Sequence, residues 1–145
     1  MSFIWPLLSV ELWKRRRFNT MTRSDLTFEI EKDFQFEAAH YFGHADANDL
    51  FKKIHGHSFA GTVRIEGDAQ EDKGWIRDLW KIEQIITETV KPLDHTVLNE
   101  VPGLEQPALE QVALWLFERL EPRLPGLSCV EVRRPSCGER ARVRK

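Results

Sequence analysis

The stretch that decides the fold is residues 55–65, which read His-Gly-His-Ser-Phe-Ala-Gly-Thr-Val-Arg-Ile. The odd positions hold His55, His57 and then Phe, Gly, Val and Ile, whereas the even positions are small or polar. Such alternation predicts a long β-strand with one face turned to the core. Because side chains two residues apart share a face of a strand, both histidines are expected to point to the same side.

An earlier strand carries a third histidine. From Phe28 to His40 the even positions hold Phe, Ile, Lys, Phe, Phe, Ala and His, which predicts a second long strand. Lys32 interrupts the apolar face, so we expect a bulge near Lys32 and Asp33. Residues 41–54 are polar and rich in turn residues, and they are expected to form a long loop that closes a hairpin.

These histidines form a candidate metal site. Three imidazoles that converge on a point, with no fourth protein ligand, are a typical set for a catalytic zinc. A structural zinc takes four ligands and usually thiolates, and the two cysteines lie far away in sequence. The alternative is that His55 and His57 only decorate a strand. The position of His40 favours the metal site, with His40, His55 and His57 as its ligands.

The segment after the second strand changes to helical spacing. Leu79, Ile82 and Ile86 recur every three or four residues behind Asp78, which is a good N-cap, and Pro92 ends this helix. The loop that follows contains an adjacent Asp-His pair.

A second helix and two short strands complete the chain. The helix is expected to begin at Pro107, because proline suits a first turn. The strands are expected at 129–134 and 139–143, around the turn 135–138. The order β-β-α-α-β-β predicts an α+β domain over residues 26–145, in which two helices cover one face of a four-stranded antiparallel sheet. The edges of so small a sheet need cover, which predicts a homo-oligomer.

Residues 1–25 differ from this domain. The apolar stretch 4–12 precedes the basic run 14–17, which is the reverse of the order in a secretory signal, and it is too short for a membrane helix. We expect an N-terminal extension that is either disordered or an artefact of start-site choice, with Met21 as the alternative start.

Composition excludes several classes of partner. The chain has 145 residues, of which 21 are basic and 23 acidic, and its net charge of −2 gives no general attraction to nucleic acid. No membrane partner is expected. Two cysteines do not form a disulfide framework, so we expect a cytoplasmic protein.

The adjacent pair Asp94 and His95 is a second candidate for chemistry. A carboxylate can orient an imidazole as proton donor and acceptor. An Asp-His pair in a loop also commonly forms a turn with a local side-chain hydrogen bond. The residues alone leave both interpretations open.

Taken together, these segments resemble the 6-pyruvoyltetrahydropterin synthase and 6-carboxytetrahydropterin synthase family. The resemblance runs from about residue 28 to the end, in the family's own element order. The matching segments are F-E-A-A-H at 36–40, H-G-H-S-F at 55–59, L-D-H-T-V-L-N at 93–99 and P-A-L-E-Q-V-A at 107–113. This combination is specific.

The resemblance implies a fold and a reaction. Family members adopt the tunnelling fold, in which subunits assemble into a barrel, commonly as a homohexamer with active sites at subunit interfaces. It implies zinc on the three histidines and 7,8-dihydroneopterin triphosphate as the pterin substrate. The metal binds hydroxyls of the side chain, and proton transfers expel triphosphate and, in the queuosine branch, acetaldehyde. The pair matching Asp94 and His95 relays protons.

Two departures from the family pattern concern the reaction itself. The family's base, a cysteine four residues before the H-G-H segment, is replaced by Phe51, which is expected to lie in the substrate site. In longer-loop members the cysteine stands six residues before, where this chain has Asp49, which could act as base in a rearranged loop.

The second departure lies in the C-terminal strand. The family's pterin-binding glutamate aligns with Arg133 or, by strand parity, with Arg134. Arginine has donors only. We expect Glu139 to supply an acceptor and Cys137 a thiol, or Cys137 to be a simple turn residue. Arg134 would then meet an anionic group of another ligand or face solvent.

The sequence therefore predicts an enzyme, a zinc-dependent pterin lyase that acts on dihydroneopterin triphosphate or a related pterin. Two alternatives stay open. One is a paralogue with a different pterin or a purine-like substrate, and the other is a non-catalytic protein that binds zinc or a ligand.

Overall fold

Two long antiparallel strands form the centre of the molecule. The computed structural model describes residues 26–44, 46 and 48–145, so the predictions for residues 1–25 lie outside the described residues. Strand β1 (Phe28–His40) pairs with β2 (His55–Gly67) in an unbroken register that ends with His40 opposite His55. The predicted hairpin is confirmed.

The predicted bulge in β1 is wrong. Lys32 lies opposite Val63 and Asp33 opposite Thr62 in continuous pairing. Lys32 can occupy a core-facing position because its long stem reaches the rim of the core, where its ammonium lies 3.1 Å from the carboxylate of Glu83. Among the described strands, the register is irregular between β2 and β4, at Arg64 and Ile65.

The sheet has five strands rather than the expected four, in the order β3-β1-β2-β4-β5. Strands β4 (Leu127–Arg134) and β5 (Glu139–Arg144) form the predicted C-terminal hairpin. The extra strand, β3 (Thr96–Val97), pairs in parallel with Ala38 and Ala39 of β1. Two residues are too few to show an alternating pattern, so β3 could not be predicted from residue types.

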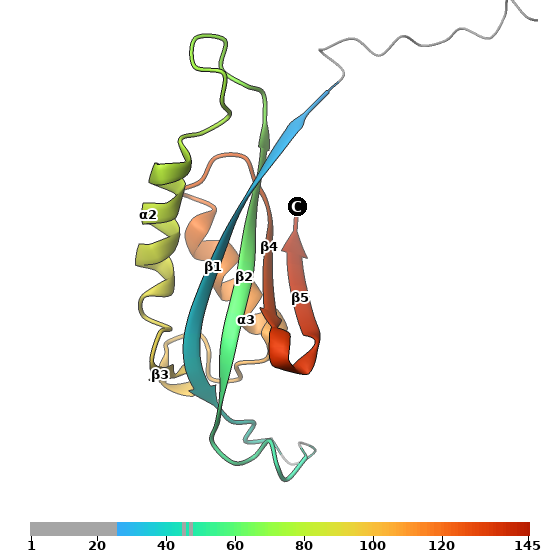
Figure 1. Cartoon of the computed structure of the whole chain (residues 1–145). Coiled ribbons are helices and arrows are strands. Elements are labelled where there is room, and N and C mark those ends of the chain that lie inside the picture. Colours follow the sequence, from blue (N-terminus) through green and yellow to red (C-terminus); the bar gives the residue numbers. More distant parts are fainter. Residues whose placement is uncertain (1–25, 45, 47) are drawn as a thin grey trace, which may run out of the picture.

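Two helices cover one face of the sheet, with α2 (Leu79–Val90) against β1 and α3 (Leu109–Leu120) against β4 and β5 (Figure 1). The predicted cap of α2 is confirmed, because the Asp78 side chain accepts a hydrogen bond from the Trp80 N–H at 2.9 Å. Helix α3 begins at Leu109, two residues after Pro107, rather than at the proline. No helix in the described part of the chain is long and apolar enough to cross a membrane.

The two faces of the sheet differ in chemistry. On the helix side, Phe36 and Phe59 stack with ring centroids 4.9 Å apart, and both are almost fully buried. The opposite side carries ion pairs, in which the buried carboxylate of Glu131 accepts from Arg133 and Arg142. The strands therefore have one apolar face that packs on the helices and one charged face.

A glycine is required where β2 crosses this core. Gly61 lies opposite Phe34, and a Cβ built on Gly61 would stand 2.1 Å from the Phe34 ring and 2.5 Å from the carbonyl oxygen of Glu131. Both distances are far below contact distance, so a side chain would displace the ring or the neighbouring strand β4.

We therefore expect Gly61→Ala to lower the free energy of unfolding by about 1–3 kcal/mol, through overpacking. Urea unfolding measures this loss. Gly43→Ala is the matched control, since its added Cβ would meet only Tyr41 at 3.9 Å, and it should leave stability nearly unchanged. Equal stability of the two variants would contradict this packing argument.

Candidate metal centre

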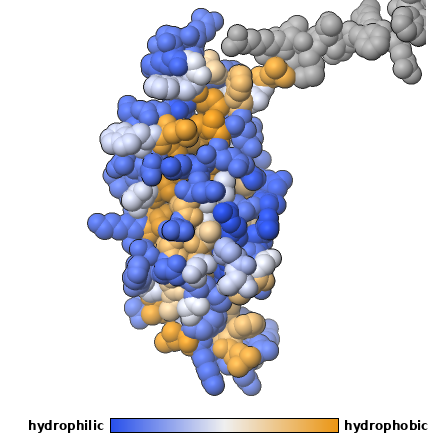
Figure 2. Space-filling model, viewed as in Figure 1, coloured by the Kyte–Doolittle hydropathy of each residue, from blue (hydrophilic) through white to orange (hydrophobic). Residues whose placement is uncertain are grey.

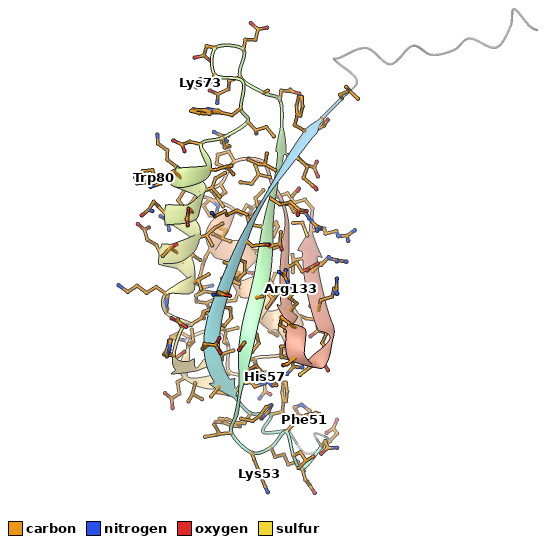
Figure 3. The ribbon with its side chains drawn as sticks, in the orientation of Figure 1. Phe51, Lys53, His57, Lys73, Trp80 and Arg133 are labelled. Atoms are coloured by element: carbon orange, nitrogen blue, oxygen red, sulfur yellow. The ribbon has the colours of Figure 1, made fainter. Side chains whose placement is uncertain are left out.

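Three histidine rings meet at one end of the β1–β2 pair. Their centroids lie 4.6 Å apart for His40 and His55, 5.1 Å for His40 and His57, and 5.0 Å for His55 and His57. The register explains this, since His40 is opposite His55 and Ala38 opposite His57. Figure 3 shows His57 at the end of β2, near the loop that carries Phe51 and Lys53.

Hydrogen bonds orient each ring through its Nδ1 atom. His40 Nδ1 lies 3.2 Å from the carbonyl oxygen of Pro107, and His55 Nδ1 lies 2.8 Å from that of Lys53. A carbonyl oxygen only accepts, so both Nδ1 atoms carry the hydrogen and donate. His57 Nδ1 lies 3.9 Å from the sulfur of Cys137. Such outer contacts are typical of histidines that bind metals through Nε2.

The Nε2 lone pairs are thereby left free to accept. Arg134 Nη1 lies 3.3 Å from His40 Nε2 and 3.2 Å from His57 Nε2, and a guanidinium only donates. His55 Nε2 is buried and has no hydrogen-bond partner among the described residues. A buried acceptor without a donor is costly, and a metal ion would use this lone pair.

The three residues fit a divalent metal ion. One ring nitrogen of each lies within 4.8 Å of those of the other two. A tetrahedral zinc with Zn–N bonds of about 2.05 Å needs these nitrogens about 3.3 Å apart, so a small closure of the rings suffices. Three protein ligands leave at least one coordination position for a small molecule.

Burial keeps two of these imidazoles, those of His40 and His57, neutral, which metal binding requires. Desolvation lowers the pKa of His40, which is only 1% exposed, from its ordinary value of 6.5 to about 4. Desolvation also lowers the pKa of His57, and the nearby Arg134 guanidinium acts in the same direction. Both rings are therefore uncharged ligands at neutral pH.

The Asp94–His95 pair is clamped onto strand β1. Asp94 Oδ1 accepts from the Glu37 N–H at 2.9 Å, and the His95 N–H donates to the Glu37 carbonyl at 2.6 Å. His95 Nδ1 lies 3.0 Å from Asp94 Oδ1, so the carboxylate holds the ring and leaves Nε2 free. The Glu37 N–H lowers the pKa of Asp94, which therefore stays ionised.

His95 adopts a left-handed backbone conformation with φ of 58°, the one positive φ of a residue other than glycine in the described chain. Such a conformation costs about 1 kcal/mol or more, and it is typically held by its surroundings. His95 and His57 both line an open groove of about 530 Å³ beside β3. The structure thus brings His95 to the same groove as one of the three histidines.

The remaining predicted site residues take different places. The Phe51 ring lies beside His55, with centroids 5.8 Å apart, and is half exposed. Asp49 is 94% exposed at its side chain and bonds to Lys52, away from the buried rings. Glu139 pairs with Arg134.

Sequence reasoning missed three contacts of the site. The Pro107 and Lys53 carbonyls that orient His40 and His55 leave no mark in the residue types, because any residue offers a carbonyl. The contact of Arg134 with the histidines could have been predicted from the sequence. Side chains alternate along a strand, so Arg134 lies on the same face as Val130 and Val132, which point to the helix side.

Fold and site together define a class: an α+β protein with a three-histidine cluster, able to hold a metal ion, at the end of a hairpin. The sequence model of the family described as 6-pyruvoyl tetrahydropterin synthase matches residues 29–145. The chain belongs to this family.

Similar proteins agree with this assignment. A 6-carboxy-5,6,7,8-tetrahydropterin synthase from Synechocystis sp. is 38% identical over 109 residues, which cover 71% of this chain and 83% of the relative. A dihydroneopterin monophosphate aldolase from Pyrococcus furiosus is 36% identical over 91 residues, which cover 63% of this chain and 73% of the relative. The structure of the Caenorhabditis elegans 6-pyruvoyl tetrahydropterin synthase superposes with a TM-score of 0.71 at 21% identity, covering 83% of this chain and 96% of that one.

The lowered pKa of His40 predicts a pH dependence of stability in the metal-free protein. Between pH 6.5 and pH 4 the unfolded state binds a proton at this ring and the folded state does not, so stability falls as the pH falls. From pH 7 to pH 5 the free energy of unfolding should drop by about 2 kcal/mol through His40.

Urea unfolding at the two pH values, with a chelator present, measures this drop. In His40→Gln the fall in the free energy of unfolding between pH 7 and pH 5 should be smaller by about 2 kcal/mol, since the amide does not titrate. An identical pH dependence in the variant would show that His40 is not held neutral by burial.

Proposed function

We propose that this chain is a cytoplasmic, zinc-dependent pterin lyase that acts on 7,8-dihydroneopterin triphosphate or a related pterin and eliminates triphosphate. The observation that carries the proposal is the set of three imidazoles that meet at the end of the hairpin, each with an Nε2 lone pair that a metal ion can use. Relatives named as pterin synthases, at up to 38% identity among those compared, support the substrate class.

The metal would be held by Nε2 of His40, His55 and His57. When bound, zinc polarises an oxygen of the substrate and makes a bound hydroxyl easier to deprotonate. Three neutral imidazoles with an open position are a typical ligand set for a catalytic zinc.

Proton transfer falls to His95 in this proposal. Asp94 keeps a hydrogen on His95 Nδ1, so Nε2 is the atom that accepts and returns a proton. Since the His95 side chain is 78% exposed, it is accessible to a substrate in the groove. Asp49 remains a candidate base only if the loop 41–54 brings it to the histidines.

Phe51 favours a second candidate, an aldol cleavage of a related pterin. The position that resembles the family's cysteine base holds Phe51, whose phenyl ring lies next to His55. A phenyl ring cannot accept a proton. The relative named dihydroneopterin monophosphate aldolase, 36% identical over the matched residues, supports this candidate. A purine-like substrate or a purely ligand-binding role would equally suit a site without the cysteine.

The open edges of the sheet support assembly into a homo-oligomeric barrel, which we propose to be a hexamer. Within the described chain, β3 covers β1 only at Ala38 and Ala39, and Asp94 and His95 bond to the backbone of Glu37, so residues 28–36 have a free outer edge. Strand β5 forms the opposite edge and carries Arg140, Arg142 and Arg144, whereas β1 carries acidic side chains. Figure 2 shows apolar surface down the middle of this view, between hydrophilic residues.

The metal site is tested by removal of one ligand. Purified protein should contain about one zinc per chain, and His55→Ala should lose most of it because two imidazoles bind zinc far more weakly than three. Metal analysis by mass spectrometry measures this. Zinc retained in full by His55→Ala would contradict the proposed ligand set.

The reaction is tested with two substrates. Dihydroneopterin triphosphate should release triphosphate from the zinc-loaded protein, and His95→Gln should lower kcat by about 100-fold or more because it removes the proton carrier. Aldehyde release from dihydroneopterin monophosphate, without reaction of the triphosphate, would support the aldolase instead. Turnover of neither substrate by zinc-loaded protein would contradict both enzymatic candidates.

Assembly is tested by light scattering. We expect a mass of about six times the 17.0 kDa of one chain. Reversing charge at the β5 edge, with Arg140→Glu and Arg144→Glu together, should shift the protein to smaller species. Lys73→Glu, in a loop at the other end of the molecule from His57 (Figure 3), is the control and should not. A monomeric wild type would contradict the barrel.

A further inference from the structure

One side chain stands where a metal would bind. Arg134 is the last residue of β4, on the helix side of the sheet with Val130 and Val132, and its side chain is only 14% exposed. Its Nη1 lies 3.3 Å from His40 Nε2 and 3.2 Å from His57 Nε2. A buried guanidinium therefore contacts two of the three metal-binding nitrogens.

These contacts use the lone pairs that a metal would use. Both Nδ1 atoms face groups outside the ring cluster, so each Nε2 has its single lone pair toward the centre. A lone pair that accepts from Nη1 cannot also bind a metal. Metal binding must therefore break both hydrogen bonds and move the guanidinium, which the positive charge of the ion also repels.

A tether keeps the guanidinium close after it moves. Arg134 Nη2 donates to the carboxylate of Glu139, which lies across the short turn η4 (Pro135–Cys137). This ion pair holds one side of the guanidinium at the mouth of the site. The other donors then become available, including Arg134 Nε, which is buried without a partner among the described residues.

The freed donors suit an anionic group. A guanidinium presents parallel N–H groups whose spacing matches the oxygens of a carboxylate or phosphate. It offers no acceptor, so it cannot satisfy the N–H groups of a neutral ring. A ligand that bound the open metal position and placed an anionic oxygen beside Arg134 would satisfy both positive centres.

We propose that Arg134 is a specificity-determining residue that links metal binding to an anionic ligand. Its guanidinium contacts Nε2 of His40 and His57, so an ion at these atoms displaces it. With metal bound, it turns to the carboxylate or phosphate of the ligand on the metal. This inference rests on the proposed function only in that the three histidines bind a divalent ion, and it does not depend on which pterin reacts.

The first experiment measures metal affinity. Cobalt(II) is titrated into the metal-free full chain, and binding is followed by its visible absorption. Arg134→Gln should bind cobalt about tenfold more tightly or better, because loss of one charged competitor is worth at least one factor of ten. Arg133→Gln is the matched control: this neighbour lies on the opposite face, bonded to Thr62 and Glu131, and should leave the affinity unchanged.

The second experiment measures the anion. Acetate and inorganic phosphate are added in separate titrations, which distinguish a carboxylate from a phosphate site. At least one should raise the apparent cobalt affinity of the wild type several-fold and change its absorption spectrum. Arg134→Gln should lose this effect, and Arg133→Gln should keep it.

Three results would overturn the inference. One is that the Arg134→Gln variant folds normally by circular dichroism but binds cobalt no more tightly than the wild type. Another is an anion effect that survives in this variant, and the third is the lack of any anion effect in the wild type. A wild type that binds no cobalt would instead contradict the metal site itself, so the two failures are distinguishable.

Discussion

The unbroken pairing of β1 with β2 is the constraint on which the rest of the structure depends. It places His40 opposite His55 and Ala38 opposite His57, so that three rings share one face at one end of a hairpin. Because a slip of one residue would turn every side chain to the other face, the apolar alternation that builds the core also fixes the metal ligands. Fold and site therefore have the same physical cause.

Burial then decides the chemistry of these rings. The helix side excludes water from His40, which keeps it neutral, and the Pro107 carbonyl just before α3 fixes its orientation. The same closeness brings the Arg134 guanidinium onto the rings. The exclusion of water that keeps the imidazole lone pairs available for a metal ion thus also brings the Arg134 guanidinium close enough to compete for them.

Local patterns predicted most of the fold and the meeting of His40, His55 and His57, since alternation and helical spacing are properties of the sequence itself. They failed where contacts between distant segments decide the outcome. Strand β3 exists only because β1 offers an edge, and Lys32 needs no bulge because Glu83 of α2 receives its ammonium. The clamp of Asp94 on Glu37 joins residues 57 positions apart, so the pair could be named as a candidate without knowledge of what holds it.

Residues in the paired strands β1 and β2 and residues in the loop between them differ in how freely they can be substituted. The three histidines belong to the paired strands β1 and β2, whereas Asp49 and Phe51 lie in the connection between them. That connection can change in length or composition without shifting a single imidazole. Loop residues such as Phe51, which lies beside His55, can therefore be replaced while the three histidines keep their places.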